Sequence, residues 1–309
     1  MDWRATWRLV KTAVAAWTDD YAPSMGAALS YYTLFSIAPL LLIVISVAGL
    51  VFGAEAARGE ILLQLRDLMG EDGAHAVQGM LEAANKPEQG ALATIIGTVF
   101  LIVGATTVFA ELQNALDRIW RAPARKTGGI FSLLRARLLS FGMILGIGFL
   151  LMVSLVASAA LSALGKWWGP WFTGWEMIGH AIDMVLGFAM TTVGFAMIYK
   201  IIPRVRIRWH DVWIGAAVTA LLFTVGKLLI GLYIGKSGVT SVFGAAASLA
   251  VLLIWVYYSA QIFLLGAEFT WAYAHTFGSL RDKPPPAPPE IPSRSTQGKR
   301  DGRRRPHPA

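Results

Sequence analysis

Ionisable side chains interrupt the long apolar stretches of this 309-residue chain, where each of them costs free energy. Asp183 and Lys227 fall inside two such stretches, at positions that would give them similar depth in a membrane. A carboxylate and an ammonium there could form a structural ion pair, or could carry a proton or a charged substrate. Lys227 could instead extend its side chain toward the headgroups, which would leave it without such a role.

A second polar group is predicted toward the opposite membrane face. Glu111 and Asn114 lie one helical turn apart at the end of one apolar stretch, and Gln261 and Glu268 lie near the end of another. The start of the first apolar stretch contributes Ser30, Tyr31, Thr33, Ser36 and Pro39. Together these residues predict a polar opening that a substrate or an ion could use. The alternative is that they hydrate the helix ends and pair with nearby arginines.

Pro39 has a consequence of its own, because a proline inside a helix removes one backbone donor and leaves the carbonyl of Phe35 without its usual partner. The hydroxyls of Thr33 and Ser36 are close enough in sequence to interact with the freed backbone. The stretch is therefore either a locally repaired kink or one wall of a polar vestibule bounded by the first, second and sixth spans.

The elements that must position these residues are six apolar runs, each about as long as the roughly 20 residues that cross a bilayer. Hydrophobic residues make up 55% of the chain, charged residues only 15%, and the mean hydropathy is +0.54. This predicts an all-α integral membrane bundle over residues 27–272, and continuous apolar runs disfavour a barrel. The predicted spans are 27–53, 91–110, 138–164, 178–199, 212–234 and 243–272.

Lys and Arg set the expected orientation, because they accumulate in cytoplasmic segments. Of the 27 Lys and Arg residues, 21 fall in the N-terminal segment, the second and fourth loops and the C-terminal tail. This predicts a protein of the bacterial inner membrane with both termini in the cytoplasm. The loop 54–90 would then lie outside, as two short helices broken at Gly70 and Gly73.

Both terminal segments have their own patterns. In residues 1–26, Trp3, Trp7, Val10, Val14 and Trp17 recur at helical spacing beside a basic stripe. This predicts an amphipathic helix that lies in the headgroup layer, packs on the protein's own loops, or does both. Residues 273–309 are rich in Pro and Arg and are predicted to be a disordered cytoplasmic tail. That tail either sets topology only or also binds anionic lipid or a partner.

Most catalytic and cofactor classes find no support. The chain has no cysteine, and its five histidines show no metal-ligand spacing. Gly231 and Gly235 resemble part of a phosphate-binding loop, but three residues separate them where four are needed. The basic residues flank predicted spans, without a nucleic-acid-binding motif. We therefore expect a protein that is not an enzyme, holds no metal or cofactor, and has membrane lipids as partners instead of nucleic acid.

Several stretches together resemble the YihY/BrkB family of bacterial inner-membrane proteins, historically also labelled ribonuclease BN. They extend over all six predicted spans. The residues that carry the resemblance are Ala28-Leu29-Ser30-Tyr31-Tyr32-Thr33-Leu34, Ala38-Pro39-Leu40, Leu116-Asp117-Arg118-Ile119-Trp120, Ile202-Pro203, Gly215-Ala216, Tyr233, Gly244, Leu253-Ile254-Trp255-Val256-Tyr257 and Leu264-Leu265-Gly266-Ala267-Glu268. The family often has asparagine where this chain has Asp117, and tyrosine where it has Phe243.

The resemblance implies a six-span helical fold with both ends inside, in a family associated with the envelope, serum resistance, and lipid or solute transport. We expect a transporter or lipid-translocating protein that handles a lipid or a small anionic solute. The alternative is a structural or scaffolding envelope protein. A ribonuclease is disfavoured, because the clustered His and Asp of a metal-dependent nuclease are missing. Gly142 and Gly146 offer a small-residue surface for helix packing within or between subunits, which leaves the oligomeric state open.

Overall fold

The computed structural model describes residues 3–84, 91–123, 175–236 and 246–282, together with positions 142, 146, 149 and 153. Across these residues the chain is helical and contains no strand, which confirms the all-α prediction. Four described segments are long and apolar enough to cross a membrane: Ala22–Leu50, Met184–Ile201, Trp209–Ile234 and Ala247–Thr276.

The six predicted spans map unequally onto these segments. Four of them overlap the apolar segments just given, and the predicted span 91–110 falls within helix α4, Ala91–Ile119. Most of the predicted span 138–164 lies outside the described residues, as does the tail beyond residue 282. Gly146, which belongs to that span, lies against Met197.

The N-terminal helix α1, Trp3–Asp19, packs on the helix that ends near the C-terminus, α9, Ala247–Thr276. Leu9 and Ala13 are buried in this contact. The side chains on the other side of α1 that were predicted as its apolar face are exposed: Trp3, Trp7, Val10 and Val14. The helix therefore carries two separate apolar faces, one covered by protein and one uncovered.

Helix α2, Ala22–Phe52, follows α1 after a two-residue turn. Tyr21 adopts a left-handed conformation with φ 57°, and Pro23 lies in the first turn of α2, where a proline needs no backbone donor. Pro39 lies inside α2 and packs against α4. A Cβ built on Gly104 would lie 3.1 Å from the Pro39 ring and 3.6 Å from the Phe35 carbonyl oxygen. Glycine at position 104 thus lets α4 approach the proline closely.

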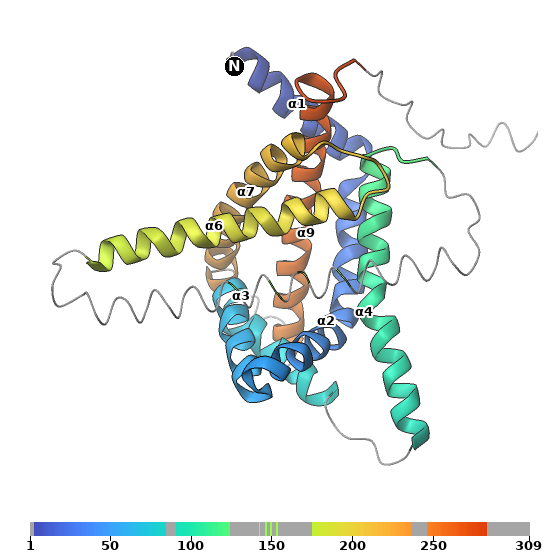
Figure 1. Cartoon of the computed structure of the whole chain (residues 1–309), viewed down its shortest axis with the longest axis vertical. Coiled ribbons are helices and arrows are strands. Elements are labelled where there is room, and N and C mark those ends of the chain that lie inside the picture. Colours follow the sequence, from blue (N-terminus) through green and yellow to red (C-terminus); the bar gives the residue numbers. More distant parts are fainter. Residues whose placement is uncertain are drawn as a thin grey trace, which may run out of the picture.

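Helix α3, Ala54–Ala84, is two helices joined at Gly70, whose φ of 79° is in the left-handed region that favours glycine. The predicted break at Gly70 is therefore present, whereas Gly73 remains helical. The helix packs against α2 and α9 at the end of the bundle drawn at the bottom of Figure 1. The indole nitrogen of Trp255, in α9, donates a hydrogen bond of 3.0 Å to the Leu68 carbonyl.

Helix α6, Trp175–Ile201, runs nearly horizontally across the upright helices of the bundle in Figure 1 and packs mainly on α7, Trp209–Lys236. Its last turns reach the core, where the fully buried Tyr199 donates a 2.7 Å hydrogen bond to the Phe263 carbonyl. Helix α9 is the central element, in contact with α1, α2, α3, α4 and α7. A central helix must be apolar on all sides, so the polar residues that α9 does carry are conspicuous.

Helices α7 and α9 pack through two reciprocal glycine–threonine contacts. A Cβ on Gly215 would lie 1.9 Å from the Thr270 hydroxyl, and a Cβ on Gly266 would lie 2.0 Å from the Thr219 hydroxyl. Each threonine hydroxyl also donates a 2.7 Å hydrogen bond to the glycine carbonyl four residues earlier in its own helix. The two helices therefore approach at the distance that only glycine permits, as is common for helices in membranes.

Asp211, near the start of α7, ties down the chain that leaves α9. Its carboxylate is 1% exposed and accepts hydrogen bonds from the backbone N–H and the hydroxyl of Ser279. We call the end of the bundle where α2 and α7 begin and α4, α6 and α9 end the basic end, because Arg118, Arg121, Lys200 and Arg204 lie there. It is the upper end in Figure 1, next to α1.

Candidate functional site

The polar residues of α9 and those of the α1–α2 turn meet at the basic end. Glu268 lies in α9, about two turns before this helix ends at Thr276, and is fully buried. Asp20 is 7% exposed. It is buried in the turn between α1 and α2, beside Tyr21 in its left-handed conformation. Two carboxyl groups from segments far apart in sequence are thus brought together out of water.

The two carboxyl groups interact directly. Asp20 and Glu268 lie close enough for a hydrogen bond between their carboxyl groups when one of them is protonated, and no other group in the described fold donates to either Glu268 oxygen. Burial raises the pKa of the Asp20 carboxyl from its usual 3.8, while the bond to Glu268 and the charges of Arg121 and Arg118 act in the opposite direction. Two ionised carboxylates are both acceptors, so a bond between them requires a proton.

Arg121 is the cation that faces this pair. It follows the end of α4 with a left-handed φ of 49°, and its guanidinium lies 4.8 Å from the centre of the Trp271 ring. Arg118 lies 5.4 Å from the centre of the Tyr21 ring. Such cation–π contacts hold the guanidinium groups in place without neutralising them. The charge of Arg121 acts on both carboxyl groups, and that of Arg118 acts on Asp20.

From this pair, a row of polar groups leads along the contact between α2 and α9 toward the middle of the bundle. The Gln261 amide, two turns before Glu268, lies so close to α2 that a Cβ on Gly26 would be 2.0 Å from its nitrogen. Its amide nitrogen and oxygen are both buried and without a hydrogen-bond partner. Ser30 and Thr33 follow on the same face of α2. We call Gly26, Ser30, Thr33, Gln261 and Glu268 the α2–α9 seam.

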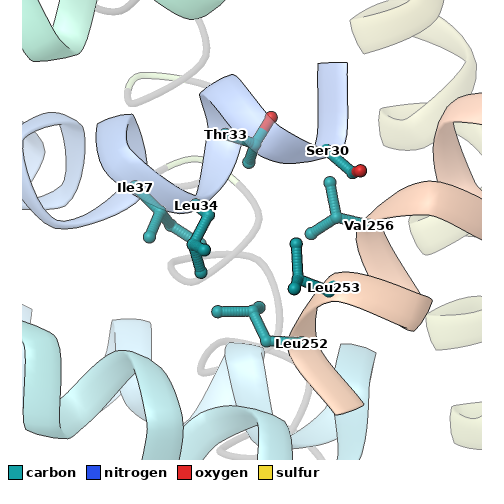
Figure 2. A pocket seen from close by; sticks show the side chains of 7 residues that line it. All are labelled: Ser30, Thr33, Leu34, Ile37, Leu252, Leu253 and Val256. Carbon is teal, nitrogen blue, oxygen red and sulfur yellow. The ribbon is translucent and has the colours of Figure 1, made fainter. Parts of the chain in front are cut away.

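A pocket continues the seam. It has an empty volume of about 160 Å³ and is lined by Ser30, Thr33, Leu34, Ile37, Leu252, Leu253 and Val256. Figure 2 shows the two hydroxyl residues on α2, with the apolar side chains of α9 across the space. The pocket is too narrow to hold a water molecule. The structure is therefore closed here, and α2 and α9 would have to separate to admit a substrate.

The structure places the other predicted site residues of α2 and α4 in different surroundings. Ser36 is 1% exposed, and its hydroxyl makes no hydrogen bond within the described part of the chain, so it does not repair the backbone at Pro39. Tyr31 is 57% exposed and packs on Tyr32 and Phe35, away from the seam. Asn114 is exposed and Glu111 partly exposed. The predicted vestibule is thus a contact between α2 and α9, with α4 outside it.

Of the expected pair of Asp183 and Lys227, only the second side chain is described. Lys227 is partly buried on α7. The side chain of Asp183 lies outside the described residues. Within the described ranges, no group of three or more His, Cys, Asp or Glu side chains could hold a metal ion.

Sequence reasoning missed Asp20, Arg121 and Trp271. Asp19 and Asp20 directly follow the basic amphipathic segment, and nothing in that pattern marks either of them as buried. The signal that could have pointed to Asp20 is Pro23. A proline favours the first turn of a helix, so it predicts a turn of the chain directly before that helix, where Asp20 lies. In the sequence, Arg121 counts among the basic residues that set the orientation, and Trp271 lies at the edge of a predicted span. Only the packing of α4 against α9 brings these two residues to the carboxyl pair.

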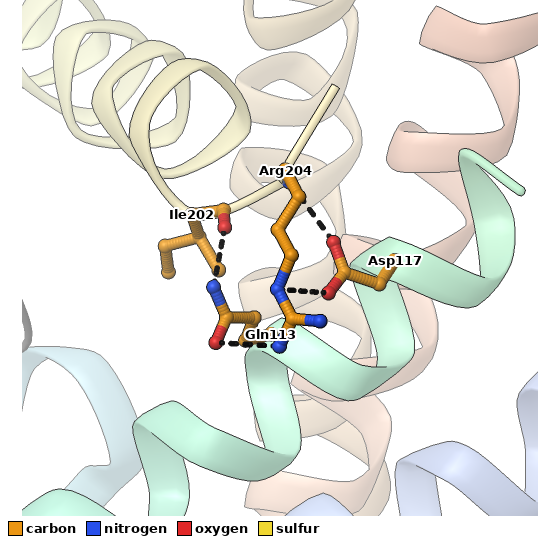
Figure 3. A network of polar contacts seen from close by, with 4 residues as sticks. All are labelled: Gln113, Asp117, Ile202 and Arg204. Atoms are coloured by element: carbon orange, nitrogen blue, oxygen red, sulfur yellow. Dashed lines mark hydrogen bonds and ion pairs between the residues drawn. The ribbon is translucent and has the colours of Figure 1, made fainter. Parts of the chain in front are cut away.

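A second polar cluster holds α4 to the connection between α6 and α7 (Figure 3). Asp117 accepts a 2.9 Å hydrogen bond from the Arg204 backbone N–H and forms a 3.2 Å ion pair with its guanidinium. Gln113 donates to the Ile202 carbonyl at 3.1 Å and accepts from Arg204 at 3.4 Å. Burial raises the pKa of Asp117, and the bonds from Arg204 oppose this shift. The cluster fixes Pro203 and its neighbours against α4.

We expect Asp117→Ala to lower the free energy of unfolding by about 2 kcal/mol, because it leaves the Arg204 N–H without its acceptor. Asparagine is frequent at this position in the family that the sequence resembles. Asp117→Asn should lower the free energy of unfolding by only about 1 kcal/mol, since its amide oxygen still accepts the bond from the Arg204 N–H. Denaturant unfolding in detergent measures both, with the exposed Asp72→Ala as the control. Equal losses for Ala and Asn would show that the ion pair, and not the backbone bond, holds the cluster.

Comparison with known proteins identifies relatives. A family model described as Virulence factor BrkB matches residues 13–290. A UPF0761 membrane protein of Tolumonas auensis is 28% identical over 274 residues, 87% of this chain and 82% of that protein. One of Pseudomonas aeruginosa is 30% identical over 255 residues, 80% of this chain but only 58% of that protein. The chain thus spans less than two thirds of that second relative. No solved structure matches.

Proposed function

We propose, from the premise that this chain belongs to the virulence factor BrkB family of membrane proteins, that it is a transporter or lipid-translocating protein of the bacterial inner membrane. The family membership agrees with the resemblance seen in the sequence. The transported compound would be a lipid or a small anionic solute. The α2–α9 seam is the observation that carries this proposal.

The seam supports a pathway because two of its buried side chains are not satisfied by the surrounding helices. The two amide atoms of Gln261 have no hydrogen-bond partner in the described fold, and Glu268 faces only another carboxyl group, that of Asp20. Ser30, by contrast, donates to the Ala27 carbonyl at 2.9 Å. A buried polar group without a partner costs about 1–3 kcal/mol, so a membrane helix that carries two of them gains something other than stability. A substrate or water that enters when α2 and α9 separate would supply the partners.

The charge of the basic end supports an anionic substrate. Arg118 and Arg121 lie beside the entrance of the seam, and Lys200 and Arg204 lie at the same end of the bundle. In the proposed orientation this end faces the cytoplasm, and basic residues there attract anionic headgroups by about 1 kcal/mol each. In this arrangement the bundle has six spans, both termini are cytoplasmic, and the uncovered face of α1 lies in the headgroup layer.

Reconstitution into liposomes tests the proposal. Purified protein is assayed with a panel of fluorescent lipids and small anions, and we expect at least one to cross faster than in empty liposomes. Ser30→Leu replaces a hydroxyl by a larger apolar side chain where α2 meets α9 and should reduce that rate at least about tenfold, as should Thr33→Leu. Ser46→Leu, on the exposed side of the same helix, is the matched control and should keep the wild-type rate.

Unchanged melting temperatures would show that a reduced rate is not a folding defect. A flat result over the whole panel with folded protein would contradict transport and favour the scaffolding role. A rate that Ser30→Leu and Thr33→Leu leave unchanged would place the pathway away from the seam.

A further inference from the structure

Asp20 and Glu268 are unusual among the buried polar groups because each faces another acceptor. Glu268 is fully buried with no donor on either oxygen, and Asp20 is the group beside it. Two ionised carboxylates at hydrogen-bond distance repel each other, and burial strengthens the repulsion. The observed contact is favourable only when one of the two carries a proton.

The charged groups around the pair come from each element packed against it. Helix α1 contributes Asp19, which is exposed, the turn contributes Tyr21, and α4 contributes Arg118 and Arg121. Helix α9 adds His275, whose ring centre lies 4.6 Å from that of Trp271, with the two rings tilted by 40°. Both guanidinium groups are also engaged with aromatic rings. Two arginines thus face three carboxyl groups, and one bound proton brings the cluster to neutrality.

We propose that Asp20 and Glu268 form a proton-binding site that latches the α1–α2 turn onto α9 and so closes the basic end of the α2–α9 seam. With the proton bound, one carboxyl O–H donates to the other carboxylate, and the turn is held. When the proton leaves to solvent, two like charges remain side by side, and the turn separates from α9. The latch does not depend on transport, since the pair binds a proton whether or not the seam carries a substrate.

The direction of the pH effect follows from Asp20. Burial raises its pKa above the usual 3.8, so the folded state favours the protonated carboxyl. A group whose pKa is raised by folding stabilises the fold fully at pH values below its unfolded pKa, and this contribution is lost as the pH rises through the folded pKa. The latch is therefore closed at lower pH and opens as the pH increases.

Hydrogen exchange of the full chain in nanodiscs tests the proposal, with rates corrected for the intrinsic effect of pH on amide exchange. As the pH rises from about 4, near the ordinary pKa of an aspartate, protection of residues 17–25 should fall about tenfold, which corresponds to one unit of pKa. Glu268→Gln should abolish this fall, because its amide N–H donates to Asp20 at every pH. Asp20→Asn should do the same from the other element. The exposed Glu55→Gln is the control and should keep the wild-type fall.

Infrared spectra of the wild-type protein give a second readout that does not need the variants to fold. The band of a protonated carboxyl should disappear over the same pH range in which residues 17–25 lose protection. The proposal is overturned if protection stays constant with pH in the wild type, if the folded variants Glu268→Gln and Asp20→Asn show the wild-type fall, or if the band and the protection change independently. Transport assays decide none of these outcomes, so this inference and the proposed function can fail separately.

Discussion

Gly266→Ala is expected to lower the free energy of unfolding by about 2 kcal/mol, although the same substitution normally strengthens a helix by up to about 1 kcal/mol. The added Cβ would lie 2.0 Å from the Thr219 hydroxyl and 2.7 Å from the Tyr199 hydroxyl. Neither group can move freely, because Thr219 is bonded to the Gly215 carbonyl and Tyr199 to the Phe263 carbonyl. The substitution must therefore push α7 away from α9.

Gly231→Ala is the matched control for this experiment. Gly231 lies in α7 as well, but a Cβ there would meet no atom within 4 Å. We expect it to leave stability unchanged or to raise it slightly, and unfolding of both variants in the same detergent measures the difference in sign. A neutral Gly266→Ala would mean that α7 and α9 pack less closely than the structure indicates.

Arg121→Asn is expected to destabilise the basic end by about 2 kcal/mol, because removing one partner of a buried charged group leaves the others uncompensated. The value is below the usual range for fully buried pairs, since Arg121 is partly exposed. Asparagine is chosen because it tolerates the left-handed backbone that Arg121 adopts, with φ 49°. The change thus tests the charge and its contact with Trp271 without straining the chain.

A double-mutant cycle separates these two effects. Adding Glu268→Gln to Arg121→Asn removes a carboxyl that the guanidinium compensated, so the double variant should recover at least half of the lost stability. The part that is not recovered measures the loss of the contact between Arg121 and Trp271. If the losses of the two single variants simply add, Arg121 and Glu268 do not interact, and the charge balance proposed for the site is wrong.

The sequence predicted well those features that depend on composition along the chain. Continuous apolar runs indicated an all-helical membrane protein, and the glycine at position 70 indicated the break in the first loop, where the structure has a positive φ. Glu268 stood out because an ionisable residue in an apolar stretch is recognisable without any partner. These are local properties, and each is encoded within one segment.

The partners of those residues were not predictable in the same way. Nothing in the sequence marked Asp20 as buried, and Tyr31 was expected to line a polar opening, but Asp20 is buried and Tyr31 is 57% exposed. One left-handed residue, Tyr21, decides the first outcome, and the direction in which α2 faces α9 decides the second. Neither depends on hydropathy.

By itself, therefore, the sequence determined that this protein is helical, lies in a membrane, and carries polar residues such as Ser30, Gln261 and Glu268 within its apolar helices. Only the tertiary structure decided that Glu268 faces Asp20 and Arg121, that the polar row runs between α2 and α9, and that Gly215 and Gly266 bring α7 onto α9. The physical reason is that apolar faces specify burial without specifying a partner. Close packing of small side chains and the turns between helices decide which helices meet. These contacts join segments that are far apart in the sequence, so no local periodicity indicates them.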